Sequence, residues 1–185
     1  MAAGSDRLGP EAWVAAAFSV LAKGGLEAVR VEPLAERLGV TKGSFYWHFK
    51  DRRALLEAVL DAWEERATAS IIARVDSKPG TPKERLAVLM SLTTSVGEGA
   101  SVEHAIRAWG ATDATVRRRL SKVDETRQAY VRDLLVGAGL TPARATARSR
   151  LFYLALIGEF TWVSLGSEPS GPALWKELYG LLTDE

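Results

Sequence analysis

The chain reads as a succession of helices, because apolar residues recur every three to four positions along almost all of its 185 residues. The alternation of apolar and polar residues that is typical of half-buried strands is missing, and glycine, proline and capping residues separate the periodic stretches. We therefore predict an all-α fold of about nine helices. We expect an N-terminal domain over residues 1–50, a long connecting helix that begins at Asp51, and a larger helical domain over residues 51–185.

Turn signals set the bounds of the predicted helices. The N-terminal helices are expected over residues 10–23, 31–38 and 42–47, followed by a long helix over 51–76. The later helices are expected over residues 82–93, 102–110, 113–136, 142–165 and 172–182. Thr81-Pro82-Lys83-Glu84 has the pattern of a capping box, and Gly97-Glu98-Gly99 is expected to interrupt the helical chain.

Composition argues against several classes of protein. The chain has no cysteine, which excludes disulfides and thiolate metal sites and fits a reducing cytoplasm. No apolar run approaches the roughly 18–20 residues that cross a bilayer, and the Met1–Pro10 segment lacks the apolar stretch of a signal peptide. The two histidines stand far apart, and no nucleophile motif or phosphate-binding loop is present. We therefore expect no enzyme, no catalytic residue, no cofactor, no metal and no membrane partner.

Positive charge is concentrated in one short stretch. Between Arg37 and Arg53 there are five basic residues and one acid, Asp51, which gives this stretch a charge of +4. The whole chain carries +1, so the remainder sums to −3. A compact basic patch on an otherwise neutral chain is typical of a local surface that contacts phosphates, whereas a sequence-independent DNA-packaging protein would carry basic charge over much of its surface.

The predicted helices over 31–38 and 42–47 are joined by Gly39-Val40-Thr41, a short turn that contains a glycine. This is the helix-turn-helix arrangement, in which the second helix of the pair enters the major groove of DNA. Leu34 and Ala35 provide a small apolar wedge between the two helices, and Thr41 is the expected N-cap of the second. Phe45 and Phe49 are expected in the core, because large aromatic side chains are mostly buried.

The segment that carries this arrangement also resembles a known family. From Val31 to Leu56 it reads Val-Glu-Pro-Leu-Ala-Glu-Arg-Leu-Gly-Val-Thr-Lys-Gly-Ser-Phe-Tyr-Trp-His-Phe-Lys-Asp-Arg-Arg-Ala-Leu-Leu. This stretch resembles the tetracycline-repressor (TetR-like) family of one-component regulators, and the resemblance extends from about Trp13 to Leu60. Beyond Trp63 only the number and length of the helices are similar.

The resemblance implies DNA contacts residue by residue. Lys42, Gly43 and Ser44 correspond to positions that read base edges, while Tyr46 and His48 correspond to positions that contact phosphates. The full set of implied DNA-binding residues is Arg30, Thr41, Lys42, Gly43, Ser44, Tyr46, Trp47, His48, Lys50 and Arg52. Arg30 departs from the family pattern, because the family usually has Thr or Ser there as a helix cap; arginine cannot accept the capping bond but can reach a phosphate.

The resemblance also implies a pocket among the middle helices and a homodimer made by the last long helices. The sequence supports both, since large apolar residues fall on inward stripes and residues 151–165 are apolar almost all round. The candidate ligand-binding residues are Trp63, Met90, Trp109, Arg127, Phe152 and Glu159. An ordinary core is the other interpretation of the apolar residues, and the two charged residues could be surface groups, structural pairs, pairs across the dimer or ligand contacts.

We therefore predict a cytoplasmic, sequence-specific transcriptional regulator. In this interpretation it is a repressor that binds a palindromic operator in double-stranded DNA as a homodimer and is released by a small, mostly apolar effector. A movement of the fourth helix would carry the effector's influence to the reading helices. The alternative is a dimeric DNA-binding regulator without a small-molecule effector, whose C-terminal domain serves only dimerisation or protein contacts.

Overall fold

The computed structural model describes residues 8–94 and 97–184, so most of the Met1–Pro10 segment lies outside the described residues. All regular structure in the described ranges is helical, and the predicted all-α fold is confirmed. The chain divides into two compact units, the first ending at Glu64 and the second beginning at Glu65. No helix in the described ranges has both the length and the apolar character needed to span a bilayer.

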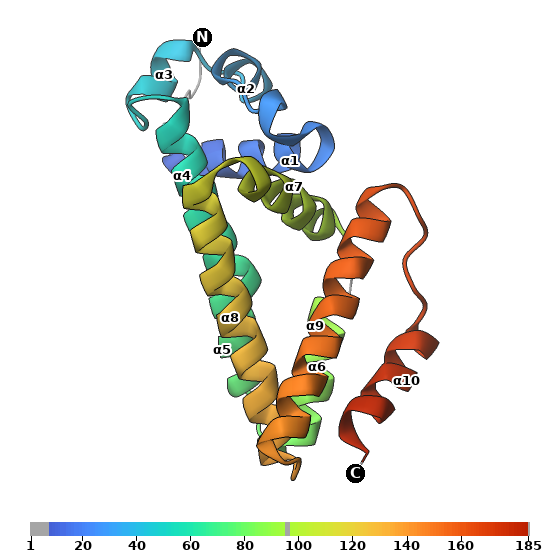
Figure 1. Ribbon diagram of the computed structural model, residues 1–185. Helices are drawn as coiled ribbons and strands as arrows, with labels where there is room; N and C mark the ends of the chain where they lie inside the picture. The colour runs from blue at the N-terminus through green and yellow to red at the C-terminus, as the bar shows by residue number, and fades with distance from the viewer. Residues whose placement is uncertain (1–7, 95–96, 185) are drawn as a thin grey trace. The chain divides into compact units, whose positions relative to one another are not determined.

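The N-terminal unit contains α1 (Pro10–Ala28), α2 (Val31–Arg37), α3 (Lys42–Tyr46) and α4 (Arg52–Glu64) (Figure 1). Within α1 the regular helix is broken at Gly25, which has a φ of 67°, in agreement with the predicted end of this helix near residue 23. The turn from α2 to α3 also depends on a left-handed glycine, because Gly39 has a φ of 67°. Asp51 caps α4, since its carboxylate accepts the Ala54 N–H at 2.8 Å.

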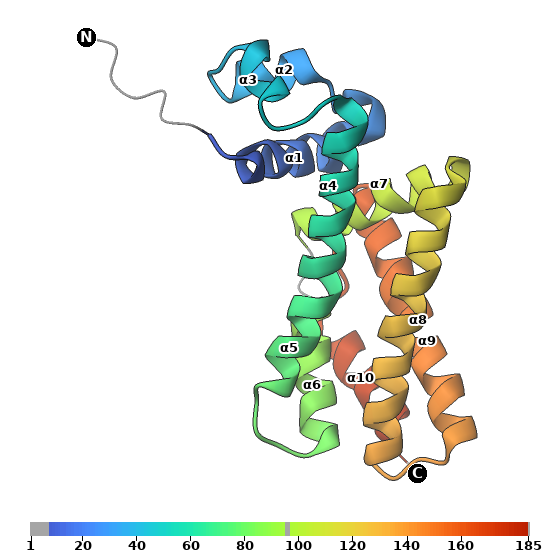
Figure 2. The ribbon, with the colours of Figure 1, turned by 90° about the vertical axis from the view of Figure 1, so that its left-hand side faces the viewer.

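The C-terminal unit contains the remaining helices, which Figure 2 shows from a second side. They are η1 (Glu65–Ala69), α5 (Ser70–Asp76), α6 (Pro82–Thr93), α7 (Glu98–Thr112), α8 (Ala114–Gly137), α9 (Pro142–Ser164) and α10 (Pro172–Thr183). α8 and α9 run side by side, and α7 packs against both. The core of this unit is apolar and includes Leu86, Leu135, Phe152 and Leu182, all fully buried.

The capping box predicted at Thr81 is present. The Thr81 hydroxyl accepts the Glu84 N–H at 3.3 Å, and the Glu84 carboxylate accepts the Thr81 N–H at 2.7 Å. These hydrogen bonds satisfy two backbone donors that the first turn of α6 would otherwise leave without partners. The pKa of Glu84 is lowered first by the bond that its carboxylate accepts from the Thr81 N–H and then by the one that it accepts from the Thr81 hydroxyl at 3.0 Å.

Two parts of the helical pattern were predicted wrongly. The long helix expected over residues 51–76 contains a π-helical turn, η1, between α4 and α5. The helix expected to begin at residue 102 begins at Glu98, so Gly99 lies inside α7 instead of interrupting the chain. Apolar periodicity did not reveal either feature, because a single π turn and a glycine in a first turn change the periodic pattern very little.

The first compact unit is longer than the predicted domain over residues 1–50. It includes α4, because α4 packs against α1. The prediction that the change of role along the chain falls near residue 50, with the second domain over 51–185, stays a prediction.

The left-handed conformation of Gly39 leads to a stability prediction. Gly39→Ala should lower the free energy of unfolding by about 1–2 kcal/mol, because a Cβ is unfavourable at positive φ. The control is Gly180→Ala within α10, where no atom lies within 4 Å of the added Cβ. That change should raise stability by roughly 0.5–1 kcal/mol. Urea titrations of both variants measure the difference. A Gly39→Ala variant with the same free energy of unfolding as wild type would contradict the role assigned to this turn.

Candidate nucleic-acid interface and internal cavity

An aromatic cluster fixes α3 against α1. The ring of Phe45 packs edge-on against Trp13, with centroids 5.2 Å apart, and stacks on Phe49 at 5.5 Å. Trp13 and Phe45 are fully buried and Phe49 is nearly so, which confirms that both phenylalanines belong to the core. Leu34 and Ala35 are buried on α2, so the apolar wedge expected between α2 and α3 is present. Burial of this face leaves the opposite face of α3 to solvent.

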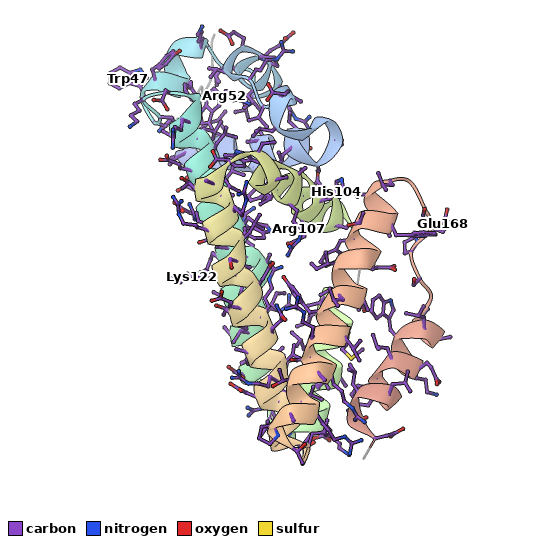
Figure 3. The ribbon with its side chains drawn as sticks, in the orientation of Figure 1. Trp47, Arg52, His104, Arg107, Lys122 and Glu168 are labelled. Carbon is purple, nitrogen blue, oxygen red and sulfur yellow. The ribbon has the colours of Figure 1, made fainter. Side chains whose placement is uncertain are left out.

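The residues predicted to contact DNA are mostly exposed on and around α3. Trp47 is 88% exposed and Tyr46 is 54% exposed, although large aromatic side chains are usually buried. Figure 3 shows Trp47 pointing outward from the end of α3. Thr41, Lys42, Gly43, His48 and Lys50 are also exposed, while Ser44 is half-buried. The helix-turn-helix unit thus presents one continuous set of polar and aromatic side chains, whose contacts with DNA stay a prediction.

The two helix starts in this region lack side-chain caps. Thr41 occupies the N-cap position of α3 as expected, but its hydroxyl makes no capping bond, so the predicted cap is wrong in its chemistry. Arg30 occupies the N-cap position of α2, is exposed and likewise makes no capping bond. Both positions have extended backbone conformations, and their side chains remain at the surface.

Lys42 forms an ion pair with Glu32 at the start of α2. The Lys42 ammonium donates a hydrogen bond to the Glu32 carboxylate, which lowers the pKa of Glu32 and raises the pKa of Lys42. Both side chains are largely exposed, so solvent screens the pair and it contributes little to stability. Lys42 is therefore held in place by a weak contact that it can exchange for another anion.

Arg52 binds two backbone carbonyls of the N-terminal unit. Its Nε donates to the Val29 carbonyl at 2.5 Å and its Nη2 donates to the Leu26 carbonyl at 2.6 Å. These carbonyls lie where α1 ends, so the half-buried Arg52 ties the start of α4 to the turn before α2. These bonds engage Nε and Nη2 of the guanidinium, and the predicted phosphate contact stays a prediction.

The C-terminal unit contains a partly open cavity of about 180 Å³. Its wall is built from η1, α5, α6, α7, α8 and α9. The lining is mainly apolar and includes Ile71, Leu89, Val131, Leu156 and Phe160.

The six predicted ligand residues do not share this cavity. Arg127 and Phe152 line it, whereas Met90 lies in the core and borders a separate depression between α6 and α10. The residues that line the cavity do not include Trp63, Trp109 or Glu159, so the expectation of one common cavity was wrong for them. The carboxylate of Glu159 instead accepts hydrogen bonds from the Ser170 N–H and hydroxyl, both at 2.7 Å, which fixes the loop before α10.

A buried group of ion pairs forms one end of the cavity wall. Glu103 on α7 is only 3% exposed, and its carboxylate accepts from Arg127 at 3.1–3.3 Å and from Arg107 at 2.9 Å. Arg107 also donates to Asp124 at 2.7 Å and to the Tyr153 hydroxyl at 2.8 Å. In Figure 3 the Arg107 side chain projects from α7 toward the space between α8 and α9. We refer to Glu103, Arg107, Asp124, Arg127 and Tyr153 as the Glu103 cluster.

The electrostatics of the Glu103 cluster keep its arginines charged. Burial alone would lower the pKa of Arg107, but the hydrogen bonds to Asp124 and the charge of Glu103 raise it above its ordinary value. Burial lowers the pKa of Arg127 too, but the charges of Glu103 and Tyr153 and the hydrogen bonds to these residues together raise it above its ordinary value. Burial raises the pKa of Tyr153. The charges of Arg127 and Arg107 lower it, but the hydrogen bond to Asp124 raises it further, so the pKa lies above its ordinary value. The tyrosine therefore stays a neutral phenol at neutral pH.

Glu103, Thr68 and Tyr153 are wall residues that the sequence did not reveal. The spacing of Glu103 and Arg107 is the one available signal, since residues four apart on a helix can pair. The partners from α8 and α9 lie far away in sequence, which no local pattern encodes.

These features define a helix-turn-helix protein, with a buried wedge, a glycine turn and an exposed second helix. Residues 14–59 match the family model described as bacterial regulatory proteins, tetR family. Over 57 residues the chain is 44% identical to the tetracycline repressor protein class C of Escherichia coli, covering 31% of this chain and 26% of that protein. Residues 14–59 thus match the TetR family, as the resemblance implied, and support a TetR-family regulator.

Solved structures extend the likeness to the whole fold. A transcriptional regulator from Rhodococcus sp. Rha1 is 26% identical, with a TM-score of 0.72 over 94% of this chain and 91% of that one. A regulator from Saccharomonospora viridis, solved in complex with choline, has a TM-score of 0.76 at 16% identity, covering 95% of this chain and 93% of that one. At 16% identity the likeness shows the fold alone.

The two carbonyl bonds of Arg52 predict a role in stability. Arg52→Met should lower the free energy of unfolding by about 1–3 kcal/mol, because the carbonyls of Leu26 and Val29 lose a charged donor. Arg53→Met is the matched control, since Arg53 is 74% exposed and pairs with Glu57 on the same helix. Its change should stay within roughly 0.5 kcal/mol. Chemical denaturation measures both changes. Equal losses of unfolding free energy in the two variants would show that the carbonyl bonds of Arg52 do not stabilise the fold.

Proposed function

We propose that the protein is a dimeric transcriptional regulator that represses genes by binding a palindromic operator and is released by a small, mostly apolar effector. It acts in the cytoplasm, where it meets double-stranded DNA. The observation that carries this proposal is the exposed face of α3 on a helix-turn-helix unit of the TetR family. The matched segment spans about a quarter of the class C tetracycline repressor's length. The proposals of an effector and of an operator therefore depend on the structural features described next.

The exposed face of α3 suits a major groove. Lys42 and Ser44 stand at the start of the helix, which is where reading helices contact base edges. Tyr46, His48 and Lys50 offer hydrogen-bond donors for phosphates, and phosphate contacts set the position of the protein without reading sequence. The ion pair of Lys42 with Glu32 keeps the lysine extended near the helix start until a base or phosphate replaces the carboxylate.

An apolar stripe along α9 supports the homodimer. Leu151, Leu154, Trp162 and Leu165 are each more than half exposed. They follow a spacing of three and four residues together with the exposed Gly158, so they form one face of the helix. A second copy that packs α8 and α9 against the same face would bury this stripe, and the small Gly158 would let the helices approach closely.

The cavity in the C-terminal unit favours a regulator with an effector over the effector-free alternative. A packed core contains few voids larger than a water molecule, whereas this cavity has a volume of about 180 Å³ and a mostly apolar wall. Sites for small molecules have this character. In the alternative, the C-terminal unit serves only dimerisation or protein contacts. The cavity would then have no function.

The DNA-binding proposal predicts different effects for two residues of α3. Lys42→Ala should weaken binding to the operator by about 1–3 kcal/mol, because a base contact is lost. Tyr46→Phe should weaken binding to operator and to unrelated DNA alike, since a phosphate contact carries no sequence information. Lys78→Ala, in the exposed loop before α6, is the charge-matched control and should bind as wild type. Fluorescence anisotropy with both DNAs measures these effects; folded variants that all bind as wild type would refute the placement of α3.

The dimer proposal predicts a concentration-dependent mass. Sedimentation should show a dimer at micromolar concentration without DNA, because an operator with two half-sites needs two reading helices about 34–36 Å apart. Leu154→Glu should weaken association at least about tenfold by placing a charge on the apolar stripe. Leu181→Glu changes an equally exposed leucine on α10 and should leave the dimer intact. A folded wild-type monomer, or dissociation caused by the α10 change alone, would overturn this arrangement.

A further inference from the structure

The charged and polar side chains at the wall of the cavity are engaged within the protein. Arg127 binds the Glu103 carboxylate through both terminal nitrogens, and its Nε donates to the Thr68 hydroxyl at 2.9 Å. The Tyr153 hydroxyl donates to Asp124 and accepts from Arg107. A molecule in the cavity therefore meets polar groups that already have hydrogen-bond partners.

The remaining polar side chains of the wall are also bonded. The Tyr130 hydroxyl donates to Asp76 at 2.7 Å, and the Thr93 hydroxyl donates to the Leu89 carbonyl of its own helix at 2.9 Å. A bonded hydroxyl such as that of Thr93 keeps a lone pair that can accept one hydrogen bond. These groups can therefore tolerate a single hydroxyl or amide on a bound molecule.

The charges of the Glu103 cluster also cancel. Two carboxylates, Glu103 and Asp124, face two guanidiniums, Arg107 and Arg127. An anion that entered the cavity would have to displace Glu103 from Arg127 and leave that carboxylate buried beside a second negative charge. A cation would meet the reverse problem, because Glu103 is held between two arginines. Burial of a charge without a partner is strongly unfavourable.

The size of the space limits the molecule further. An apolar cavity of about 150 Å³ is large enough to bind benzene, and this cavity has about 180 Å³. Aromatic and aliphatic side chains, among them Ile71, Leu89, Phe152 and Phe160, surround it. The wall thus suits a flat, apolar body of one or two rings.

We infer that the cavity accepts small uncharged compounds, with an apolar body of about one or two rings and at most one hydrogen-bonding group, and that it rejects organic anions and cations of the same shape. This inference names the chemical class of the effector and rests on the proposed function. The Glu103 cluster acts as the filter, because its charges are satisfied before any ligand arrives.

A near-isosteric series tests the filter on the full-length protein. Benzyl alcohol, benzoate and benzylammonium have similar size, and the last two carry a full charge at neutral pH. Isothermal titration should give benzyl alcohol an affinity at least about tenfold higher than that of either ion. Ala100→Leu should abolish binding of benzyl alcohol, because Ala100 lines the cavity and is buried, so the larger side chain takes up part of its volume.

Two variants should change the charge preference in opposite directions. Glu103→Gln removes the carboxylate beside Arg127, so the affinity for benzoate relative to benzyl alcohol should rise about tenfold. Arg127→Met removes one of the two cations beside Glu103, so the relative affinity for benzylammonium should rise by a similar factor. Circular dichroism establishes that each variant is folded, and the wild-type series remains decisive if either is not.

The outcomes separate this inference from the proposed function. Preference of the wild type for benzoate or benzylammonium would overturn the inference while leaving an effector site in place. Binding of no probe would overturn the inference and favour the effector-free regulator, provided that the protein still binds DNA in the same preparation. If Ala100→Leu leaves the binding of benzyl alcohol unchanged, the binding site lies outside the cavity and the inference is overturned as well.

Discussion

The carboxylate of Glu103 is buried among helices, and an ionised group in that position is stable only with partners. Arg107 from its own helix and Arg127 from α8 supply them, while Asp124 and Tyr153 complete the coordination of Arg107. Since these residues come from α7, α8 and α9, the charge requirement fixes how the three helices pack. Replacement of one member would leave its neighbours with unbalanced charge, so the cluster sets the geometry as a unit.

The same cluster determines what the cavity wall offers. Tyr153 lines the cavity, and it also borders a depression on the outer side of α8 and α9 together with Arg107 and Asp124. Leu154, which belongs to the apolar stripe proposed for the dimer, borders that depression too. One hydrogen-bonded group therefore reaches from the cavity to the surface where a second copy is proposed to pack. A ligand that displaces Tyr153 would therefore change both the cavity wall and the surface depression beside Leu154.

Local sequence signals predicted the parts of the fold that depend on neighbours in the chain. The glycine turn at Gly39, the capping box at Thr81 and the burial of Phe45 and Phe49 follow from backbone conformation, capping and apolar spacing. The partner choices could not be predicted, because a helical stripe shows which face is buried and not which helix covers it. The sequence therefore did not reveal that the guanidinium of Arg52 binds carbonyls at the end of α1. Trp109 was predicted to line the cavity for the same reason, and the hydrogen bond between Glu159 and Ser170 was not predicted.

The chain passes from one compact unit to the other only once, between Glu64 and Glu65. The π turn η1 begins at that point, within a helical run that starts at Arg52 and ends at Asp76. Thr68 in η1 lines the cavity and accepts the hydrogen bond from Arg127. A π turn is rare, and it is frequently found at functional sites. Any influence of a ligand that travels along the backbone to the N-terminal unit must cross η1, and the hydrogen bond from Arg127 to Thr68 links the Glu103 cluster to this segment.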